Sequence, residues 1–596
     1  MTAVLQRDAA LVRWDLSELY ASAQDPAIER ALAGALEAAR RLEARYRGRL
    51  EGMAPSEFAG MMAELEEHYD LIARPTLYAH LLHSLNTAAP LAGRLAARVR
   101  EATAECGRHL VFLPVELAGL SPERVASLVA DPRARVYEHE IEKQRRQGPH
   151  RLSETEERLL NDLDPVASSA WVRLFRELCA AIRPSVQGHD VPLAAALALL
   201  TDPRRELREE ASHAISRALD RDLKTRSYVF NVVLQEHAIS DRLRSFPTWL
   251  SARNLANEAT DASVEALVDA VASRYDLAAR YYRVKRGLLG VDRLHEWDRY
   301  APVRATSREL DWALASELVL GAYQDFSPTA GSLVRQLFEN PWIDAPVADG
   351  KENGAYCAGS TPRIHPFVML NVTGKLDDAV SLAHEAGHAL HYMLASRQHV
   401  FDYHPPLTLA ESASVFGQTL VLERILAAES DPRVKLSMLC NQVENAIATI
   451  FRQVAFSRFE AAVHTRRRQE GELSMDQLGD AWQEQLQAMF GDGLELTPEH
   501  RSWWSYIEPF VHTPGYVYAY AFGNLLALSL YRRYQEVGEP FVESYLEVLA
   551  AGGSRSPDEL VRSLGMDVSD PGFWQAGLAI LEGMVGEVER LAADAT

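Results

Sequence analysis

The segment His384-Glu385-Ala386-Gly387-His388 contains residues whose types and spacing could hold and use a metal ion. Residues four apart lie on one face of a helix, so the two histidines can offer nitrogens to one ion at the roughly 2.0 to 2.1 Å that zinc requires. Glu385 is offset by about 100° around the helix and would lie beside the ion. The spacing therefore predicts a metal centre in which Glu385 is the general base, accepting a proton from metal-activated water and passing it to a leaving amine.

A catalytic zinc site also needs a third protein ligand and an open position for water. A second helical stretch, from Thr408 to Ile425, places Glu411 in its first turns, and we predict Glu411 as the third ligand. The longer HExxHxxGxxH pattern is absent because position 394 is Leu394. His391 lies one turn beyond His388 and cannot easily reach the same ion, so we predict a structural role for it.

Two polar residues, Ser414 and Gln418, share the predicted helix face of Glu411. Either side chain could orient a metal ligand or form a hydrogen bond with a neighbouring histidine. The alternative is that both are ordinary polar residues.

A stretch around residue 512 is dense in aromatic side chains with polar tips. Thr513 as the cap and Pro514 as the first helical residue predict that a helix starts here. Tyr516 and Tyr520 would then project on one side, while Tyr518 points largely away. Hydroxyl and imidazole donors can stabilise a developing oxyanion, but tyrosines also pack in cores through their apolar rings, and both interpretations stay open.

The elements that must position these residues are predicted from periodicity. Apolar residues recur at i, i+3, i+4 and i+7 in segments rich in Ala, Leu, Glu and Arg, which predicts a mainly helical protein. The clearest such segments are residues 28–46, 153–163, 263–289 and 433–464.

One region departs from the helical pattern. Tyr356 to Val372 is rich in aromatic and β-branched residues and contains two prolines. We predict one or two short strands here, ending at the turn formed by Thr373 and Gly374. A helix starting close to Leu376 then carries the two histidines.

Length and charge limit the classes of function. The chain has 596 residues, with 62 Lys and Arg against 83 Asp and Glu, for a formal net charge of -21. That charge repels polyanions, so we expect neither nucleic acid nor a membrane as partner. The first residues lack the pattern of a secretory signal, and the four cysteines lie too far apart for paired metal-ligand spacing. We predict a cytoplasmic protein with reduced thiols.

Four motifs together resemble the M3 family of zinc metallopeptidases, and in particular its oligoendopeptidase F branch. They are HEAGHALH at 384–391, AESASVF at 410–416, GAYCAG at 354–359 and HTPGYVYAYAFG at 512–523. Weaker similarity, including RLSETEERLLNDL at 151–163 and WLSARNLAN at 249–257, extends the resemblance over most of the chain.

The resemblance implies an elongated, two-lobed helical metallopeptidase with a deep central channel and a small β element beside the zinc-binding helix. Residues 1–190 would form an N-terminal helical region, and residues 191–596 the catalytic region. A strand within residues 356–364 would pair with the peptide backbone. By this resemblance one Zn²⁺ per chain is held by His384, His388 and Glu411, Glu385 is the base, and substrate-binding residues complete the site. These last residues are His512, Tyr516 and Tyr520.

The function expected from these observations is zinc-dependent hydrolysis of short, unstructured oligopeptides at internal bonds. Two residues depart from the branch, because an acidic residue usually stands where this chain has Gln418 and a histidine commonly stands at Pro509. A catalytically silent or weakened zinc-containing protein that binds peptides is therefore the alternative. A helical carboxypeptidase that also uses HExxH is a further alternative, separable by its products.

Overall fold

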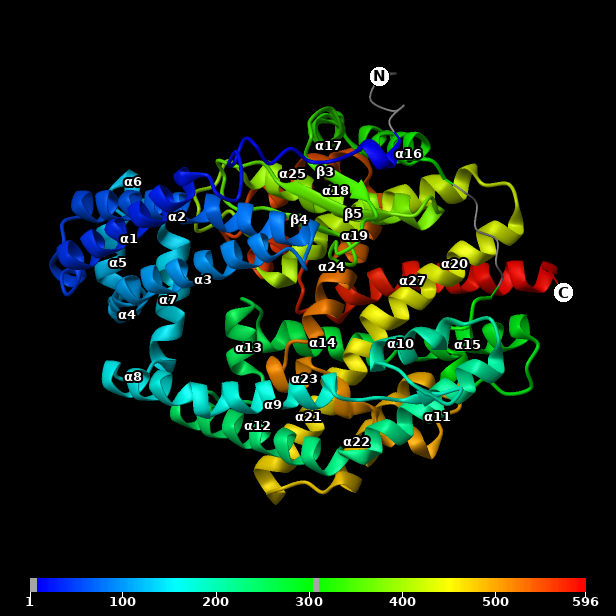
Figure 1. The fold of residues 1–596 in the computed structure, drawn as a ribbon. Helices are drawn as coiled ribbons and strands as arrows, with labels where there is room; N and C mark the ends of the chain where they lie inside the picture. The colour runs from blue at the N-terminus through cyan, green and yellow to red at the C-terminus, as the bar shows by residue number, and fades with distance from the viewer. Residues whose placement is uncertain (1–7, 304–309, 596) are drawn as a thin grey trace. The chain divides into compact units, whose positions relative to one another are not determined.

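The computed structural model describes residues 8–303 and 310–595, and most of these residues are helical (Figure 1). The mainly α fold class is therefore confirmed. The described chain divides into two compact units, each built from three segments. Unit 1 comprises residues 1–149, 307–428 and 533–566, and unit 2 comprises residues 150–306, 429–532 and 567–596. Residue 190 lies inside unit 2, and the division of the catalytic region at that position stays a prediction.

Unit 1 contains the N-terminal helices, a small sheet and the predicted metal helices. Its α-helices and strands are α1 (Pro26–Tyr46), α2 (Pro55–Leu85), α3 (Pro90–Leu110), α4 (Phe112–Gly119), α5 (Pro122–Leu128), α6 (Pro132–Arg135), α7 (Glu138–Gln147), α16 (Trp312–Phe326), α17 (Pro328–Glu339), β3 (Ile343–Pro346), β4 (Tyr356–Ala358), β5 (Phe367–Val372), α18 (Leu376–Ala395), α19 (Leu407–Ala428), α25 (Glu539–Ala550) and α26 (Pro557–Ser563).

The described residues of unit 2 form helices and one short hairpin. Its elements are α8 (Glu154–Leu163), α9 (Ser168–Ala180), β1 (Ser185–Val186), β2 (His189–Asp190), α10 (Leu193–Ala198), α11 (Arg205–Arg221), α12 (Leu223–Leu243), α13 (Ser251–Ala256), α14 (Asp261–Ala272), α15 (Asp276–Leu289), α20 (Pro432–Ala446), α21 (Arg452–Glu470), α22 (Met475–Phe490), α23 (Pro509–His512) and α27 (Pro571–Ala595). Helix α24 (Tyr518–Val537) contributes residues to both units.

Local chemistry explains the helix boundaries. The Asp25 carboxylate accepts a hydrogen bond from the Ala27 amide at the start of α1, with Pro26 as its first residue. Helix α8 starts with a capping box in which Ser153 and Glu156 bond each other's backbone amides.

The periodic segment at residues 263–289 is not one helix. It belongs to α14 and α15, which are separated near Ser273, whose hydroxyl donates to the Ala270 carbonyl at 2.7 Å. Such a local side-chain bond competes with helix continuation. The segment at 433–464 runs from α20 through a short π-helical stretch, Ile447–Phe451, into α21.

The predicted strands are confirmed and belong to a three-stranded sheet with the order β3-β5-β4. Strand β5 pairs in parallel with β3 and antiparallel with β4, where Cys357 lies opposite Val368. Strand β3 was not predicted, because its four residues are all buried and give no alternating pattern. Among the described strands, β4 is at an edge of this sheet.

The N-terminal helices and the sheet share one hydrophobic core. The Trp14 ring lies edge-on to Phe367 of β5, with ring centroids 6.1 Å apart. Tyr356 and Ala358 of β4 pack against the same core. These contacts hold the sheet in place next to α18, which follows β5 directly in the chain.

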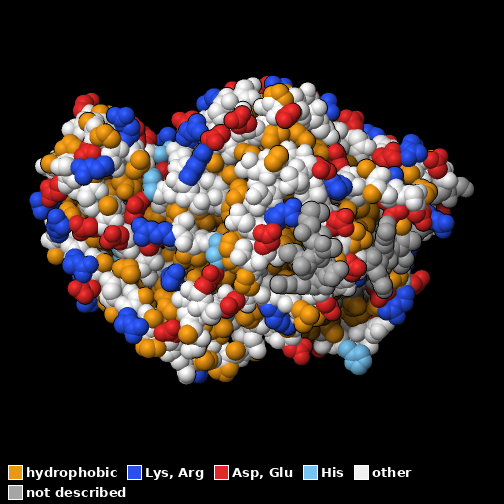
Figure 2. Space-filling model, turned by 90° about the horizontal axis from the view of Figure 1, so that it is seen from above, with side chains coloured by type: hydrophobic (Ala, Val, Ile, Leu, Met, Phe, Trp, Pro, Cys, Tyr) orange, Lys and Arg blue, Asp and Glu red, His pale blue; other side chains and the backbone are white. Residues whose placement is uncertain are grey.

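Within the described part of the chain, we find no helix that combines the length and the apolar character of a membrane span. Acidic and basic side chains are interspersed on the face drawn in Figure 2. The placement of the protein in the cytoplasm stays a prediction.

Candidate metal centre

Helix α18 starts at Leu376, as predicted. The Asp378 carboxylate in its first turn accepts the backbone amides of Thr373 (2.8 Å) and Lys375 (2.9 Å). A carboxylate at this position also interacts favourably with the helix dipole. The first turn is thereby tied to the end of β5, and this fixes where the two histidines of α18 lie.

Two glycines allow α18 and α19 to cross closely. A Cβ atom added at Gly387 would lie 2.4 Å from the Ala413 carbonyl oxygen and 2.6 Å from Ser414 Cα. On α19, a Cβ atom at Gly417 would collide with the Tyr323 hydroxyl, which donates to the Ala383 carbonyl at 2.9 Å. The close crossing brings the first turns of α19 to the histidine face of α18.

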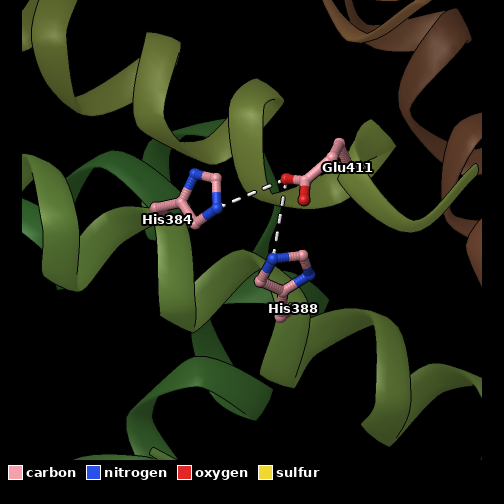
Figure 3. Close-up of side chains that lie close together, drawn as sticks. All are labelled: His384, His388 and Glu411. Carbon is pink, nitrogen blue, oxygen red and sulfur yellow. Dashed lines mark ion pairs between the residues drawn. The ribbon is translucent and has the colours of Figure 1, made fainter. Parts of the chain in front are cut away.

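The three predicted ligands meet at this crossing (Figure 3). Glu411 Oε2 lies 3.3 Å from His384 Nε2 and 3.6 Å from His388 Nε2. One ligand atom from each residue lies within 4.8 Å of the others, the only such group of three among the described residues. Ligands about 2.0 to 2.2 Å from a tetrahedral ion are themselves roughly 3.3 to 3.6 Å apart. Two imidazoles and one carboxylate therefore fit a divalent metal ion.

The second nitrogen of each imidazole has its own partner. His384 Nδ1 donates to Gln418 Oε1 at 3.1 Å, since an amide oxygen only accepts, and this leaves Nε2, which faces Glu411, as the nitrogen that can bind a metal. The His388 ring forms a hydrogen bond with the Ala410 backbone. Ser414 Oγ donates to Glu411 Oε2 at 2.5 Å. Ser414 and Gln418 thus contact ligands, as one of the two interpretations of the sequence proposed.

In the metal-free site, the pKa values of the two carboxyl groups, Glu411 and Glu385, are shifted in opposite directions. Burial acts to raise the pKa of Glu411, but the hydrogen bond from His384 and the two imidazole charges outweigh it and lower this pKa to about 2. Burial lowers the pKa of His388 to about 4. The pKa of Glu385 is raised to about 7, mainly by burial, with His384 opposing the rise and Glu411 adding to it. The lowered pKa values of Glu411 and His388 favour the deprotonated states that bind a metal. Burial acts to lower the pKa of His384 as well, but its hydrogen bond to Glu411 and the charge of that carboxylate outweigh burial and raise it.

Glu385 lies next to the ligands without joining them. Its side chain is buried, and its Oε2 atom has no hydrogen-bond partner among the described residues. A buried carboxyl oxygen with no protein partner can interact with a water molecule or a substrate at the same place. Burial raises the pKa of the Cys357 thiol on β4, and the charge of Glu385 adds to the rise.

His391 lies outside the group of three ligands. It is buried, and burial lowers its pKa to about 3, so it is a neutral histidine inside the helix packing. This agrees with the structural role predicted for it.

The segment from His512 to Tyr520 belongs to unit 2, so its place in the active site stays a prediction. The helix predicted to start at Pro514 does not form there: α23 ends at His512 and α24 starts at Tyr518. The reason is Gly515, whose φ of +75° belongs to a turn. Tyr516 and Tyr520 nevertheless lie together, with ring centroids 4.9 Å apart.

The faces of this segment differ in exposure. His512 and Tyr520 are exposed, and Tyr518 is completely buried, where its hydroxyl accepts a hydrogen bond from Asn257 at 3.0 Å. Tyr518 thus points away, as predicted.

Comparison with known proteins agrees with this geometry. The model of peptidase family M3 matches residues 326–580, and the model named Oligopeptidase F matches residues 116–183. Oligopeptidase PepF of Bacillus subtilis is 25% identical over 558 residues, covering 92% of this chain and 82% of that protein. Group B oligopeptidase PepB of Streptococcus agalactiae is 26% identical and covers 87% of both chains.

Solved structures share the fold over nearly the whole chain. A protein from Chlamydophila abortus has a TM-score of 0.86 at 22% identity, with 99% of each chain covered. Oligoendopeptidase-F from Enterococcus faecium has a TM-score of 0.73 at 23% identity, covering 95% of this chain and 99% of that one.

Fold and site together define a helical metalloendopeptidase. The chain belongs to peptidase family M3, in its oligoendopeptidase F branch.

Proposed function

We propose that this protein is a zinc-dependent endopeptidase that hydrolyses short, unstructured oligopeptides. The observation that supports it best is that Glu411 lies 3.3 Å from His384 Nε2 and 3.6 Å from His388 Nε2, separations suited to two ligands of one zinc ion, next to the buried carboxyl group of Glu385. Peptide substrates follow from the family, and the relatives named oligopeptidase and oligoendopeptidase F favour short ones.

His384, His388 and Glu411 would hold the ion. When bound, zinc supplies Lewis-acid chemistry, lowering the pKa of a water molecule and polarising the peptide carbonyl. Glu385 takes a proton from the attacking water and returns it to the leaving amine. Glu385 suits both transfers because its carboxyl group lies beside the ligands and its Oε2 atom has no hydrogen-bond partner among the described residues.

The remaining predicted residues would act on the substrate. His512, Tyr516 and Tyr520 supply imidazole and hydroxyl donors that bind the peptide and stabilise the negative charge of the tetrahedral intermediate. The edge of β4 would pair with the backbone of an extended peptide by strand addition. Such pairing recognises the main chain, which is why an unstructured peptide is the expected substrate.

A quenched fluorescent peptide of about eight to ten residues tests the proposal. Zinc-loaded protein should cleave it, a chelator should stop cleavage, and Glu385→Gln should abolish cleavage while zinc content persists. Glu423→Gln is the matched control, because Glu423 is exposed on α19 and the chemical change is the same. No cleavage of a diverse peptide mixture by the zinc-loaded protein would favour the silent, peptide-binding alternative.

Early products identified by mass spectrometry separate an endopeptidase from a carboxypeptidase. Internal fragments are expected, because the proposed mechanism requires no free carboxyl terminus. A ladder of products shortened by single C-terminal residues would contradict the endopeptidase assignment.

A further inference from the structure

The turn of unit 2 that contains Gly515 is held by a buried acid from another helix. Gly515 donates its backbone amide to Glu460 Oε1 at 2.8 Å, and Glu460 of α21 is completely buried. The other oxygen, Oε2, has no partner among the described residues. A fully buried carboxyl group is costly to retain in a core, so a specific bond to a loop amide calls for a functional explanation.

The same turn sits in a fitted recess. A Cβ atom at Gly515 would lie 2.7 Å from Leu250 Cδ1 and 3.5 Å from both Trp249 and Arg253. We call Trp249, Leu250, Arg253 and Glu460 the Gly515 cradle. Three of its members belong to the WLSARNLAN motif at residues 249–257, which the catalytic proposal leaves without a role.

The cradle is tied to α21 at a second point. The Trp249 ring stacks on His464, one turn beyond Glu460, with ring centroids 4.6 Å apart and an angle of 20° between the planes. Asn257, at the end of the same motif, donates to the buried Tyr518 hydroxyl at 3.0 Å. The buried side of the segment is therefore fixed by Glu460 on one helix and by Asn257 after another.

The opposite side of the segment is available to a ligand. His512 and Tyr520 are exposed, and the Tyr516 ring lies against that of Tyr520. We propose that Glu460 is a positioning residue: by holding the Gly515 amide, it sets the backbone from which His512, Tyr516 and Tyr520 reach the peptide. This inference rests on the proposed function, and it assigns to Glu460 and the WLSARNLAN motif a part in turnover without substrate contact.

Glu460→Leu and Glu460→Gln test the inference. Leucine cannot accept the Gly515 amide, whereas the glutamine amide oxygen can. Misplacement of catalytic groups by about 1 Å costs roughly 10²-fold in rate. Glu460→Leu should therefore lower kcat by about 10- to 100-fold and raise KM, because the displaced residues also bind the peptide, while zinc content stays unchanged. Glu460→Gln should stay within about threefold of the wild type. Glu470→Leu, exposed at the end of α21, is the matched control.

Hydrogen exchange of the backbone amides gives a readout that does not depend on catalysis. Glu460→Leu should accelerate exchange in peptides covering residues 511–520 and leave those covering α18 unchanged. Tyr518→Phe removes the hydrogen bond from Asn257, the second contact that holds the segment, and should also accelerate exchange in residues 511–520. This variant serves as the test if Glu460→Leu does not fold. Equal kinetics and exchange in Glu460→Leu and Glu470→Leu would overturn the inference.

Failure of the proposed function leaves a different signature. If the wild type cleaves no peptide, the proposed function is wrong, and so is the proposed role of Glu460 in turnover. The hydrogen-exchange data then still show whether Glu460 holds the segment of residues 511–520 in place. If exchange accelerates but an active enzyme keeps its kcat, the positioning role is wrong and the proposed function stands.

Discussion

Gly387 is expected to control how closely α18 and α19 approach, and Gly387→Ala tests this. The added Cβ atom would lie 2.4 Å from the Ala413 carbonyl oxygen, against a minimum of 3.0 Å for real Cβ contacts, so the helices must separate by 0.6 Å or more. Metal sites tolerate about 0.2 Å of change in ligand distance. The separation therefore exceeds what His384, His388 and Glu411 can absorb around one ion.

The expected effect of Gly387→Ala has two parts. Overpacking at the crossing should destabilise the protein by about 1 to 3 kcal/mol, partly offset by the higher helix propensity of alanine, which is worth about 1 kcal/mol. Displacement of Glu411 should weaken zinc binding by roughly 10- to 100-fold, the range seen when the support of a ligand is lost. Urea unfolding of the metal-free protein measures the first part, and chelator competition the second.

Gly34→Ala is the matched control for this experiment. Gly34 lies within α1 of the same unit, and an added Cβ atom would meet nothing within 4 Å. Alanine there should stabilise the protein by about 0.5 to 1 kcal/mol and leave zinc affinity unchanged. If Gly387→Ala behaved like Gly34→Ala in both assays, the explanation of the site by a close helix crossing would be refuted.

Three further outcomes are expected. Gln418→Glu should tighten zinc binding in a chelator competition, because a carboxylate accepting from His384 Nδ1 raises the basicity of the ligand nitrogen; equal affinity would contradict this. His384→Ala should lose zinc yet keep its circular dichroism spectrum at room temperature, because a catalytic ion is not needed to hold a large helical core together. Unfolding of this variant would indicate a structural metal instead. Burial raises the pKa of Glu460 to about 8 in the folded state, from about 4.5 in the unfolded state. Between these two pH values the folded state binds a proton that the unfolded state has released, so the free energy of unfolding decreases as the pH rises from about 4.5 to about 8. Thermal melts should show a smaller loss in Glu460→Gln than in the wild type, because Glu385, whose pKa is also raised, still contributes.

The sequence predicts the metal ligands because their signal is local. His384 and His388 are related by one helical turn, and Glu411 stands at the start of the next strongly helical stretch. The packing that brings the ligands together is harder to predict from the sequence. Gly387 is visible within the HEAGH motif, but only the packed structure shows that Ala413 and Ser414 occupy the space where a side chain would be.

Elements that depend on distant contacts were missed for the same reason. Pro514 is a good first residue for a helix, yet Gly515 turns the chain because its amide and its small size suit the Gly515 cradle. Strand β3 is short and wholly buried, and only its pairing with β5 makes it a strand. Glu460 reads as an ordinary helical glutamate until its complete burial is known.

The division of each unit into three chain segments has a consequence for biosynthesis. Unit 1 includes residues 533–566, and unit 2 includes α27, which packs against α14, α15 and α20. Contacts between segments so distant in sequence form slowly, because a long loop must close before they are made. On the ribosome, neither unit can be completed until its C-terminal helices emerge. The nascent chain must therefore hold α18 and α19, with their apolar faces, partly unassembled while residues 429–566 are synthesised, a period in which chaperones would be expected to bind it.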